Sequence, residues 1–330
     1  MADQHIQWFP GHMAKTRKLI AENLKLVDVV VEILDARLPK SSQNPLIDAL
    51  AGGKPRVLVL AKADLAEEEY SKAWVEHFRG RGMYALACDL KGPGAKSGMK
   101  AIAEGMRRQA GGVLARRQAR GIGSRVVRAM VTGIPNAGKS TLINLLAGKA
   151  RAETGDRPGV TRGKQWIRLE QDLELLDMPG ILWPNLEDRD GARKLAVTGA
   201  IGENAYHPLE LALWLVRWLL ENRPGRLSGR YGAAESRMDD EVGGVLESWR
   251  RDREAAEMGG DGEEAGEESD LLPLALLEII GRRRGFLRKG SMVDREKTAV
   301  MLLDELRGGK LGRVTWDMPP AKGGEADEAV

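Results

Sequence analysis

Apolar residues along the first two thirds of the chain form short unbroken runs, and stretches with helical spacing of apolar positions lie between these runs. Unbroken, often β-branched runs are typical of buried strands. They predict strands at 27–34, 56–60, 83–88 and 126–131. The spacing between these runs predicts helices at 67–79, 97–118 and from Thr141 onward. Strands that alternate with helices indicate an α/β fold.

The pattern changes beyond about residue 200. Before this point, segments 164–169 and 173–176 predict a β-hairpin. From about Tyr206 the periodicity is helical, with helices expected at 209–220, 271–280 and 295–306. We therefore expect an α/β domain over residues 1–200 and an α-helical domain over 201–330. An acidic, glycine-rich segment near 257–270 predicts a disordered loop within the second domain.

Composition narrows the class of protein. The chain has 330 residues, of which 42% are hydrophobic, so it can form a substantial core. Its single cysteine, Cys88, excludes an intrachain disulfide and a cysteine-rich zinc site. The N-terminus lacks the features of a signal peptide, and the most apolar segment is too short to span a bilayer. We therefore expect a cytoplasmic protein without membrane attachment.

The stretch Gly133-Ile134-Pro135-Asn136-Ala137-Gly138-Lys139-Ser140-Thr141 fits the phosphate-binding pattern G-x-x-x-x-G-K-[S/T]. It lies between a predicted strand and a predicted helix, which is the context that this motif requires. Backbone N–H groups of the loop and the helix N-terminus would surround an anion. Lys139 would reach the β- and γ-phosphates, and the Ser140 hydroxyl would bind Mg²⁺. The alternative is an ordinary glycine-rich turn, but Lys-Ser at a helix start has no packing purpose of its own.

The predicted strand at 56–60 ends in Ala61-Lys62-Ala63-Asp64, which resembles the guanine-reading motif Asn-Lys-x-Asp with Ala61 in place of Asn. The Asp64 carboxylate can accept two hydrogen bonds from guanine, and adenine does not supply both. The stem of Lys62 can lie along the base plane. Losing the Asn amide removes about 0.5–1.5 kcal/mol of binding, so we expect weaker nucleotide binding with guanine preference kept. Cys88 and Asp89, after the next strand, lie where such proteins close over the base.

Two further segments carry candidate chemistry. Asp177-Met178-Pro179-Gly180 fits D-x-x-G, in which Asp177 would hold Mg²⁺ through water and the Gly180 N–H would contact the γ-phosphate. Thr161, in a preceding Gly/Pro loop, is the candidate for a second Mg²⁺ ligand. Asp35 and Arg37 follow the first predicted strand, where open α/β sheets bind ligands. These two residues form either a local ion pair or part of the site.

The order of the motifs is unusual. In ordinary small GTPases the base-reading motif comes last, whereas here it precedes the phosphate loop by about seventy positions. A circular permutation would still build the same site, because domains with nearby termini tolerate it. The D-x-x-G segment then leads directly into the C-terminal helical domain. This connection would tie the γ-phosphate sensor to that domain as an order–disorder switch.

With the permuted order, three sequences resemble the bacterial ribosome biogenesis GTPase A family (the YlqF/RbgA type) over nearly the whole chain. They are Trp8-Phe9-Pro10-Gly11-His12-Met13-Ala14-Lys15, Asp35-Ala36-Arg37-Leu38-Pro39 and Gly309-Lys310-Leu311-Gly312-Arg313. The resemblance implies a circularly permuted P-loop GTPase domain followed by a helical domain. It also implies a cytoplasmic enzyme that binds GTP, GDP and Mg²⁺ and acts late in assembly of the large ribosomal subunit and its rRNA. We expect a monomer off the ribosome.

The catalytic group is not obvious, because Ile181 occupies the position after D-x-x-G where many GTPases carry a water-orienting Gln. By itself His12, at a predicted helix start, is more typical of a cap or a surface residue. The resemblance implies that His12 replaces the Gln when the ribosome is bound. It also makes Asn136 a candidate K⁺ ligand near the β/γ bridge, with simple stabilisation of the loop as the alternative.

RNA binding is suggested by the charge of the C-terminal region. Residues 282–313 contain ten basic and four acidic side chains, a local net charge of +6. Such a surface suits contacts with phosphates, although a solvated helix face is the usual explanation of such a run. Two other functions remain open: a nucleotide-dependent RNA scaffold with negligible hydrolysis, and an ATP-using P-loop enzyme, which Lys62 and Asp64 disfavour.

Overall fold

The computed structural model describes residues 13–121, 126–147, 165–178, 182, 188–232 and 271–320. Contacts between Cα atoms divide the chain into two compact units. The first, here called the nucleotide unit, comprises residues 1–195, 199–202 and 313–330, and the second, the helical unit, comprises 196–198 and 203–312. The segment from Arg313 onward therefore groups with the nucleotide unit, although the sequence pattern suggests the helical domain. The chain enters the helical unit and then returns.

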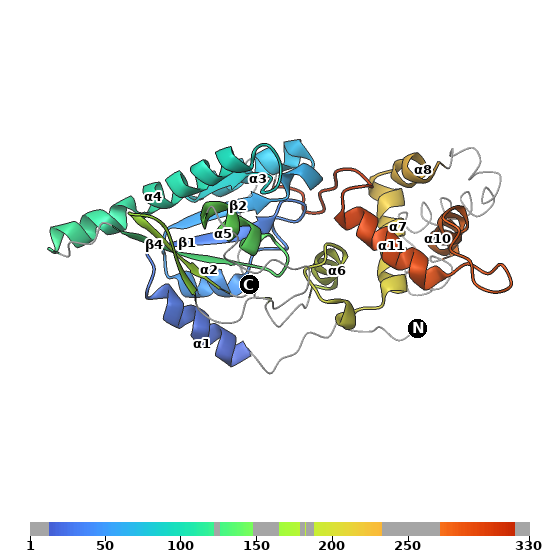
Figure 1. The fold of residues 1–330 in the computed structure, drawn as a ribbon, viewed down its shortest axis with the longest axis horizontal. Helices are drawn as coiled ribbons and strands as arrows, with labels where there is room; N and C mark the ends of the chain where they lie inside the picture. Colours follow the sequence, from blue (N-terminus) through green and yellow to red (C-terminus); the bar gives the residue numbers. More distant parts are fainter. Residues whose placement is uncertain are drawn as a thin grey trace, which may run out of the picture. The chain divides into compact units, whose positions relative to one another are not determined.

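Six strands form the sheet of the nucleotide unit, in the order β3-β2-β1-β4-β6-β5 (Figure 1). Their bounds are Val29–Asp35 (β1), Arg56–Ala61 (β2), Tyr84–Ala87 (β3), Val127–Gly133 (β4), Gln165–Glu170 (β5) and Leu173–Asp177 (β6). Neighbouring strands are parallel except β5 and β6, which form the antiparallel hairpin that the sequence predicts. The strand before the phosphate loop, β4, lies between β1 and β6, so the permuted chain places this loop in the middle of the sheet.

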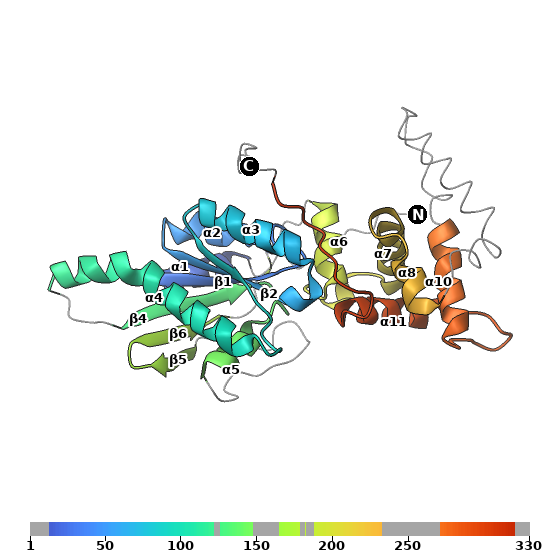
Figure 2. The same cartoon turned by 90° about the horizontal axis from the view of Figure 1, so that it is seen from above.

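Helices cover both faces of this sheet. α1 (Met13–Leu24), α2 (Pro45–Ala51) and α3 (Glu68–Gly80) pack on one face, and α4 (Ala95–Ala119) and α5 (Lys139–Ala147) on the other (Figure 2). Val30 packs with α1 and α2, and Leu34 packs with α3. These two β1 residues are an even number of positions apart and so share a face. Every residue of β1 is buried, as expected for a strand covered on both sides.

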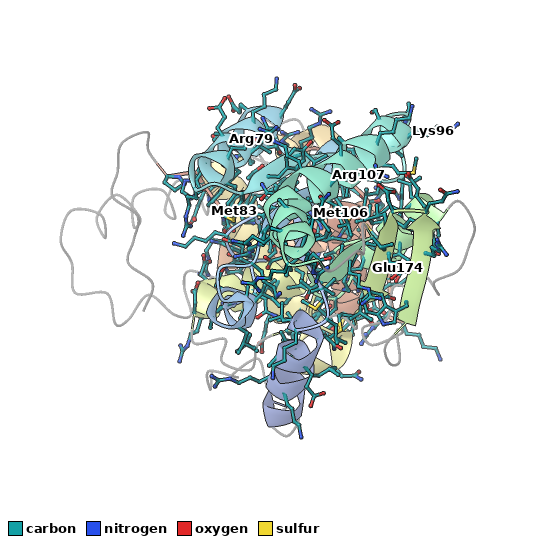
Figure 3. All side chains as sticks on the ribbon, turned by 90° about the vertical axis from the view of Figure 1, so that its left-hand side faces the viewer. Arg79, Met83, Lys96, Met106, Arg107 and Glu174 are labelled. Atoms are coloured by element: carbon teal, nitrogen blue, oxygen red, sulfur yellow. The ribbon has the colours of Figure 1, made fainter. Side chains whose placement is uncertain are left out.

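The long helix α4 contacts β1, β2 and β4. Figure 3 labels two neighbouring residues of this helix, Met106 and Arg107. Met106 is buried, whereas the partly exposed Arg107 forms ion pairs with Glu170 and Asp172. These pairs tie α4 to the β5–β6 hairpin.

The helical unit contains α7 (Pro208–Asn222), α10 (Leu271–Arg283) and α11 (Arg295–Arg307), as the periodicity predicts. It also contains the short helix α8 (Arg226–Tyr231), which the sequence analysis does not predict. α6 (Arg189–Val197) crosses the boundary between the units. α11 packs against α7 and α10, and its buried Glu305 forms ion pairs with Arg230 and Arg284. A single β-bridge between Leu287 and Val293 departs from the all-helical expectation. None of the helices in the described ranges is long and apolar enough to cross a membrane.

Candidate nucleotide-binding site

The candidate residues follow five strands that end at one edge of the sheet. β1, β2, β3, β4 and β6 are mutually parallel, so their carboxyl ends meet at the edge where open α/β sheets bind ligands. The structure thus gathers, from separate parts of the sequence, the segments at Asp35, Lys62, Cys88, Gly133 and Asp177. The permutation changes the order of these segments along the chain but leaves their meeting point intact.

The phosphate loop adopts backbone conformations that few side chains allow. Gly133 has φ 149° and Gly138 has φ 111°, while Asn136 is left-handed at φ 56°. A Cβ atom at Gly133 would collide with the Ile33 carbonyl of the adjacent strand. The two glycines are therefore required by the shape of the loop, which ends where Lys139 begins α5.

Lys139 and Asp177 are buried at the phosphate side of the site with few compensating partners. The Lys139 ammonium donates a hydrogen bond to the Ile134 carbonyl at 2.8 Å. Burial lowers the pKa of Lys139 to about 8; the charge of Asp177 opposes this shift and that of Lys62 adds to it. Burial raises the pKa of Asp177 to about 6, against the charge of Lys139 and the backbone N–H of Met178. Both groups are in an environment that favours the uncharged form.

The environment of Asp177 fits a bound divalent cation. The residue is 1% exposed, and no side chain within the described ranges donates a hydrogen bond to either of its carboxylate oxygens. A buried carboxylate without such partners is costly unless a cation or water shell satisfies it. Mg²⁺ prefers oxygen ligands and keeps several of its waters, so the donor set of Asp177 and Ser140 suits it.

Asp35 and Arg37 form an ion pair on the base side. The Arg37 guanidinium donates two hydrogen bonds to the Asp35 carboxylate, at 2.9 and 2.7 Å. The Lys62 ammonium donates a third, at 3.0 Å. Burial alone would raise the pKa of Asp35, but Arg37 and Lys62 outweigh it and hold the pKa below its usual value. Of the two roles open from sequence, the structure shows the local ion pair of Asp35 with Arg37, and Asp35 also holds the Lys62 ammonium.

Asp64 differs from its neighbours because its side chain is exposed at the edge of the site. It lies in a short 3₁₀ helix, η2 (Ala63–Leu65), which follows the left-handed residue Lys62 at φ 58°. No hydrogen bond or ion pair within the described ranges holds its carboxylate. The oxygens of Asp64 are therefore accessible to the N1–H and N2 amino groups of a guanine base.

Cys88 and Asp89 have local structural partners. The Cys88 backbone N–H donates to the Leu60 carbonyl at 3.0 Å, and the Cys88 carbonyl accepts from the Ala63 N–H at 3.5 Å. Burial raises the pKa of the Cys88 thiol to about 11, which favours its neutral form. Asp89 accepts a hydrogen bond from the Lys91 N–H at 2.8 Å. Both residues shape the loop beside the base-reading segment.

Ala61 and Leu90 pack where the base-reading and phosphate loops approach each other. Ala61 is fully buried, and its Cβ lies 3.8 Å from the position that a Cβ of Gly138 would occupy. The Leu90 Cδ1 atom lies 3.3 Å from the same position. Both side chains thus lie close to Gly138 of the phosphate loop, and Ala61 occupies the position of the expected Asn. The sequence places Leu90 in the loop 88–92 expected beside the base but gives its side chain no role, because a lone leucine in a loop carries no motif.

The side chain of Asn136 donates a hydrogen bond to the Gly199 carbonyl at 2.8 Å. This bond links the phosphate loop to the short segment 199–202 of the nucleotide unit. It gives Asn136 a role in stabilising the loop, one of the two roles open from sequence. No sequence motif marks Gly199 as its partner.

Several predicted residues lie outside the described residues: His12, Thr161, Gly180 and Ile181. Their predicted roles stay predictions. Among the described basic residues of 282–313, many form ion pairs. Arg284 pairs with Glu305, Arg288 with Asp294, and Arg295 with Glu278. Part of the local positive charge is therefore neutralised within the helical unit.

Comparison with known proteins agrees with this geometry. A family model described as "50S ribosome-binding GTPase" matches residues 128–225. The protein named ribosome biogenesis GTPase A in Bacillus cereus is 41% identical, over 98% of this chain and 97% of that protein. The protein of the same name in Priestia megaterium is 42% identical, over 95% of this chain and 97% of that protein. A GDP-bound YlqF structure is 26% identical, with a TM-score of 0.56 over 91% of this chain and 99% of that chain. A structure of GNP-bound YlqF from Thermotoga maritima is also 26% identical, with a TM-score of 0.51 over 92% of this chain and 98% of that chain.

Proposed function

This chain belongs to the ribosome biogenesis GTPase A family, and from that premise we propose that it hydrolyses GTP in a late step of large ribosomal subunit assembly. In this proposal GTP and GDP occupy the site between the loops after β2 and β4, and the nucleotide state controls binding to the subunit. The observation that carries the proposal is the buried pair Lys139 and Asp177 beside a phosphate loop, with Asp64 exposed at the base side.

The chemistry of phosphoryl transfer explains these residue types. The transition state spreads negative charge over the γ-phosphate oxygens, so positioning and electrostatic stabilisation provide most of the catalysis. Lys139 and the backbone N–H groups of Asn136, Ala137 and Gly138 would bind the phosphates. Ser140, Asp177 and Thr161 would hold Mg²⁺, which supplies additional positive charge to the phosphates when bound.

Two parts of the reaction rest on residues predicted from sequence. The Gly180 N–H would contact the γ-phosphate, and His12 would orient the attacking water, since Ile181 is apolar. Asn136 is the candidate K⁺ ligand near the β/γ bridge. Its hydrogen bond to Gly199 occupies the amide nitrogen, and a cation would require its amide oxygen.

The partner in this proposal is rRNA of the large subunit, in the cytoplasm, with a monomeric protein off the ribosome. The exposed basic residues of 282–313 would contact phosphates by shape and charge rather than by base sequence. Binding should therefore weaken steeply as salt is raised.

The decisive experiment is GTP turnover with K⁺ and Mg²⁺, with and without large ribosomal subunits, for the wild type and for His12→Ala. We expect strong stimulation by the subunits that is lost in His12→Ala. Replacing K⁺ by Na⁺ at constant ionic strength tests the monovalent site, and unchanged turnover would remove K⁺ from the proposal.

If large ribosomal subunits did not stimulate GTP turnover, the result would contradict the proposal that the protein acts as a GTP-hydrolysing enzyme during assembly. If GTP-dependent binding to the subunit persisted under those conditions, the protein would act as a nucleotide-dependent scaffold. Tighter binding of ATP than of GTP would contradict both functions, because Asp64 would then not be reading the base.

A further inference from the structure

The chain returns from the helical unit as an extended segment that crosses the nucleotide unit, here called the strap (residues 313–317). It begins after Gly312, a left-handed glycine at φ 83°. Val314, Thr315, Trp316 and Asp317 are all buried. Figure 2 shows it as the red segment beyond α11. Burial of four successive residues indicates that this segment is packed into the nucleotide unit along its length.

One end of the strap binds the residues just after Asp64. The Val314 N–H donates to the Leu65 carbonyl at 3.0 Å. The Glu67 N–H donates to the Thr315 hydroxyl at 3.0 Å, and the Thr315 N–H donates to the Glu67 carboxylate at 3.2 Å. Three hydrogen bonds thus fix the C-terminal end of the turn that carries Asp64.

The other end of the strap is fixed to separate parts of the nucleotide unit. The Trp316 N–H donates to the Arg37 carbonyl at 2.7 Å, and the Trp74 indole N–H donates to the Asp317 carbonyl at 2.8 Å. The Asp317 carboxylate accepts from the Ser41 N–H at 2.6 Å and from the Ser41 hydroxyl at 2.9 Å. Lys194 of α6 completes this set at 3.3 Å. The strap is therefore a rigid support rather than a loose tail.

The base-reading turn depends on such support. η2 has only three residues, and Ala61 lacks the amide that the expected Asn would supply. No side chain in the described ranges holds the Asp64 carboxylate. Its position is set by the backbone, which is held at one end by β2 and the Cys88 carbonyl and at the other by the strap. Recognition of a base by two hydrogen bonds to one carboxylate tolerates little displacement.

We propose that the strap is a positioning element for guanine recognition, in which Thr315 and Val314 hold the turn that aims Asp64 at the base. Thr315 is a positioning residue and does not contact the nucleotide. The proposal rests on the guanine site of the proposed function. It assigns to the C-terminal end of the chain a role in base specificity that no motif of the sequence indicates.

The test compares GDP with inosine diphosphate, which lacks the 2-amino group that Asp64 would bind. Thr315→Val removes the hydroxyl with little change of volume. We expect GDP affinity to fall about five-fold, the size of one lost hydrogen bond, and the GDP preference over inosine diphosphate to shrink. Mg²⁺-pyrophosphate, which has no base, should bind as in the wild type. Thr315→Ser, which keeps a hydroxyl, should restore the GDP preference.

Thr298→Val is the matched control. Thr298 is a fully buried threonine in α11 whose hydroxyl donates to the Asp294 carbonyl at 2.8 Å, within the helical unit. This variant should lower the unfolding temperature without changing the GDP preference. If Thr315→Val does not fold, Asp317→Asn tests the strap from its other end and should also reduce the GDP preference.

Two outcomes would overturn the proposal: a preference unchanged in a folded Thr315→Val, or equal weakening of GDP, inosine diphosphate and pyrophosphate. The first would show that the turn holds its position without the strap, and the second would indicate general destabilisation. A wild type that binds ADP as tightly as GDP would instead contradict the guanine site itself, and with it the proposed function.

Discussion

The phosphate side and the base side of the site are built from opposite electrostatic arrangements. On the phosphate side, Lys139 and Asp177 are buried with few partners. Burial lowers the pKa of Lys139 to about 8 and raises that of Asp177 to about 6, so the uncharged form of each is favoured. On the base side, Asp35 is buried too, but Arg37 and Lys62 satisfy it fully. The phosphate side is thus costly until a ligand arrives, whereas the buried carboxylate of the base side already has its cationic partners. Ligand binding should therefore stabilise the protein mainly through the phosphate side.

The largest expected effect concerns the completed base side. Arg37→Met removes the guanidinium of a fully buried ion pair and should destabilise the fold by about 3–5 kcal/mol. The Asp35 carboxylate then keeps only Lys62 and the backbone N–H of residue 37 as partners. Urea unfolding measures this change. Arg107→Met is the control, since its pairs with Glu170 and Asp172 are exposed and should contribute less than about 1 kcal/mol. Equal losses in both variants would mean that Asp35 is not dependent on Arg37.

The second prediction compares two lysines of the site. Lys139→Ala should weaken GTP binding about 100-fold, since charge-assisted hydrogen bonds to phosphate contribute most there. Lys62→Met should weaken it less than about ten-fold, because the Lys62 ammonium is bound to Asp35 rather than to a ligand. Titration with a fluorescent GTP analogue measures the dissociation constants of both variants and of the wild type. A larger loss in Lys62→Met would reverse the contrast between the two sides.

A third prediction uses the raised pKa of Asp177. Its pKa of about 6 in the folded protein exceeds the usual 3.8, so folding free energy is lost as the pH rises from 3.8 to about 6, and the loss persists at higher pH. Without nucleotide and Mg²⁺, Asp177→Asn should therefore be more stable than the wild type at pH 7.5, by on the order of 1–3 kcal/mol. The difference should shrink as the pH falls from about 6 and disappear below 3.8, where the carboxyl is protonated in both states.

Urea unfolding at several pH values measures this difference, and addition of Mg²⁺ and GDP provides the control. Bound ligand stabilises the wild type by mass action, so the order of stability should reverse. A wild type that is the more stable protein without ligand would show that Asp177 is already satisfied, and that the phosphate side is no costlier than the base side.

The smallest expected effect concerns Ala61. Ala61→Asn restores the usual base-reading motif and should strengthen GDP binding by about 0.5–1.5 kcal/mol if the amide reaches the nucleotide or the loop. Calorimetric titration with GDP measures it. A loss of stability with no gain in affinity would indicate that Leu90 and Gly138 occupy the space of the amide.

The sequence by itself determined the local elements and the chemistry-bearing loops. Alternating strand and helix patterns predicted the α/β sheet, and the glycine positions predicted the phosphate loop, because these features depend on residues close together in the chain. The hairpin β5–β6 and the helices α7, α10 and α11 follow from the same local periodicity. The relation to its family is likewise contained in short motifs and their order.

Only the tertiary structure decided which distant residues meet. It brought Asp35 to Lys62, Asn136 to Gly199 and Thr315 to Glu67, pairs that no local pattern specifies. It also returned residues 313–317 to the nucleotide unit, although the sequence pattern places them in the helical domain. The physical reason is that these hydrogen bonds join residues far apart in the sequence, so local patterns do not specify them. Their partners depend on where the rest of the chain has folded.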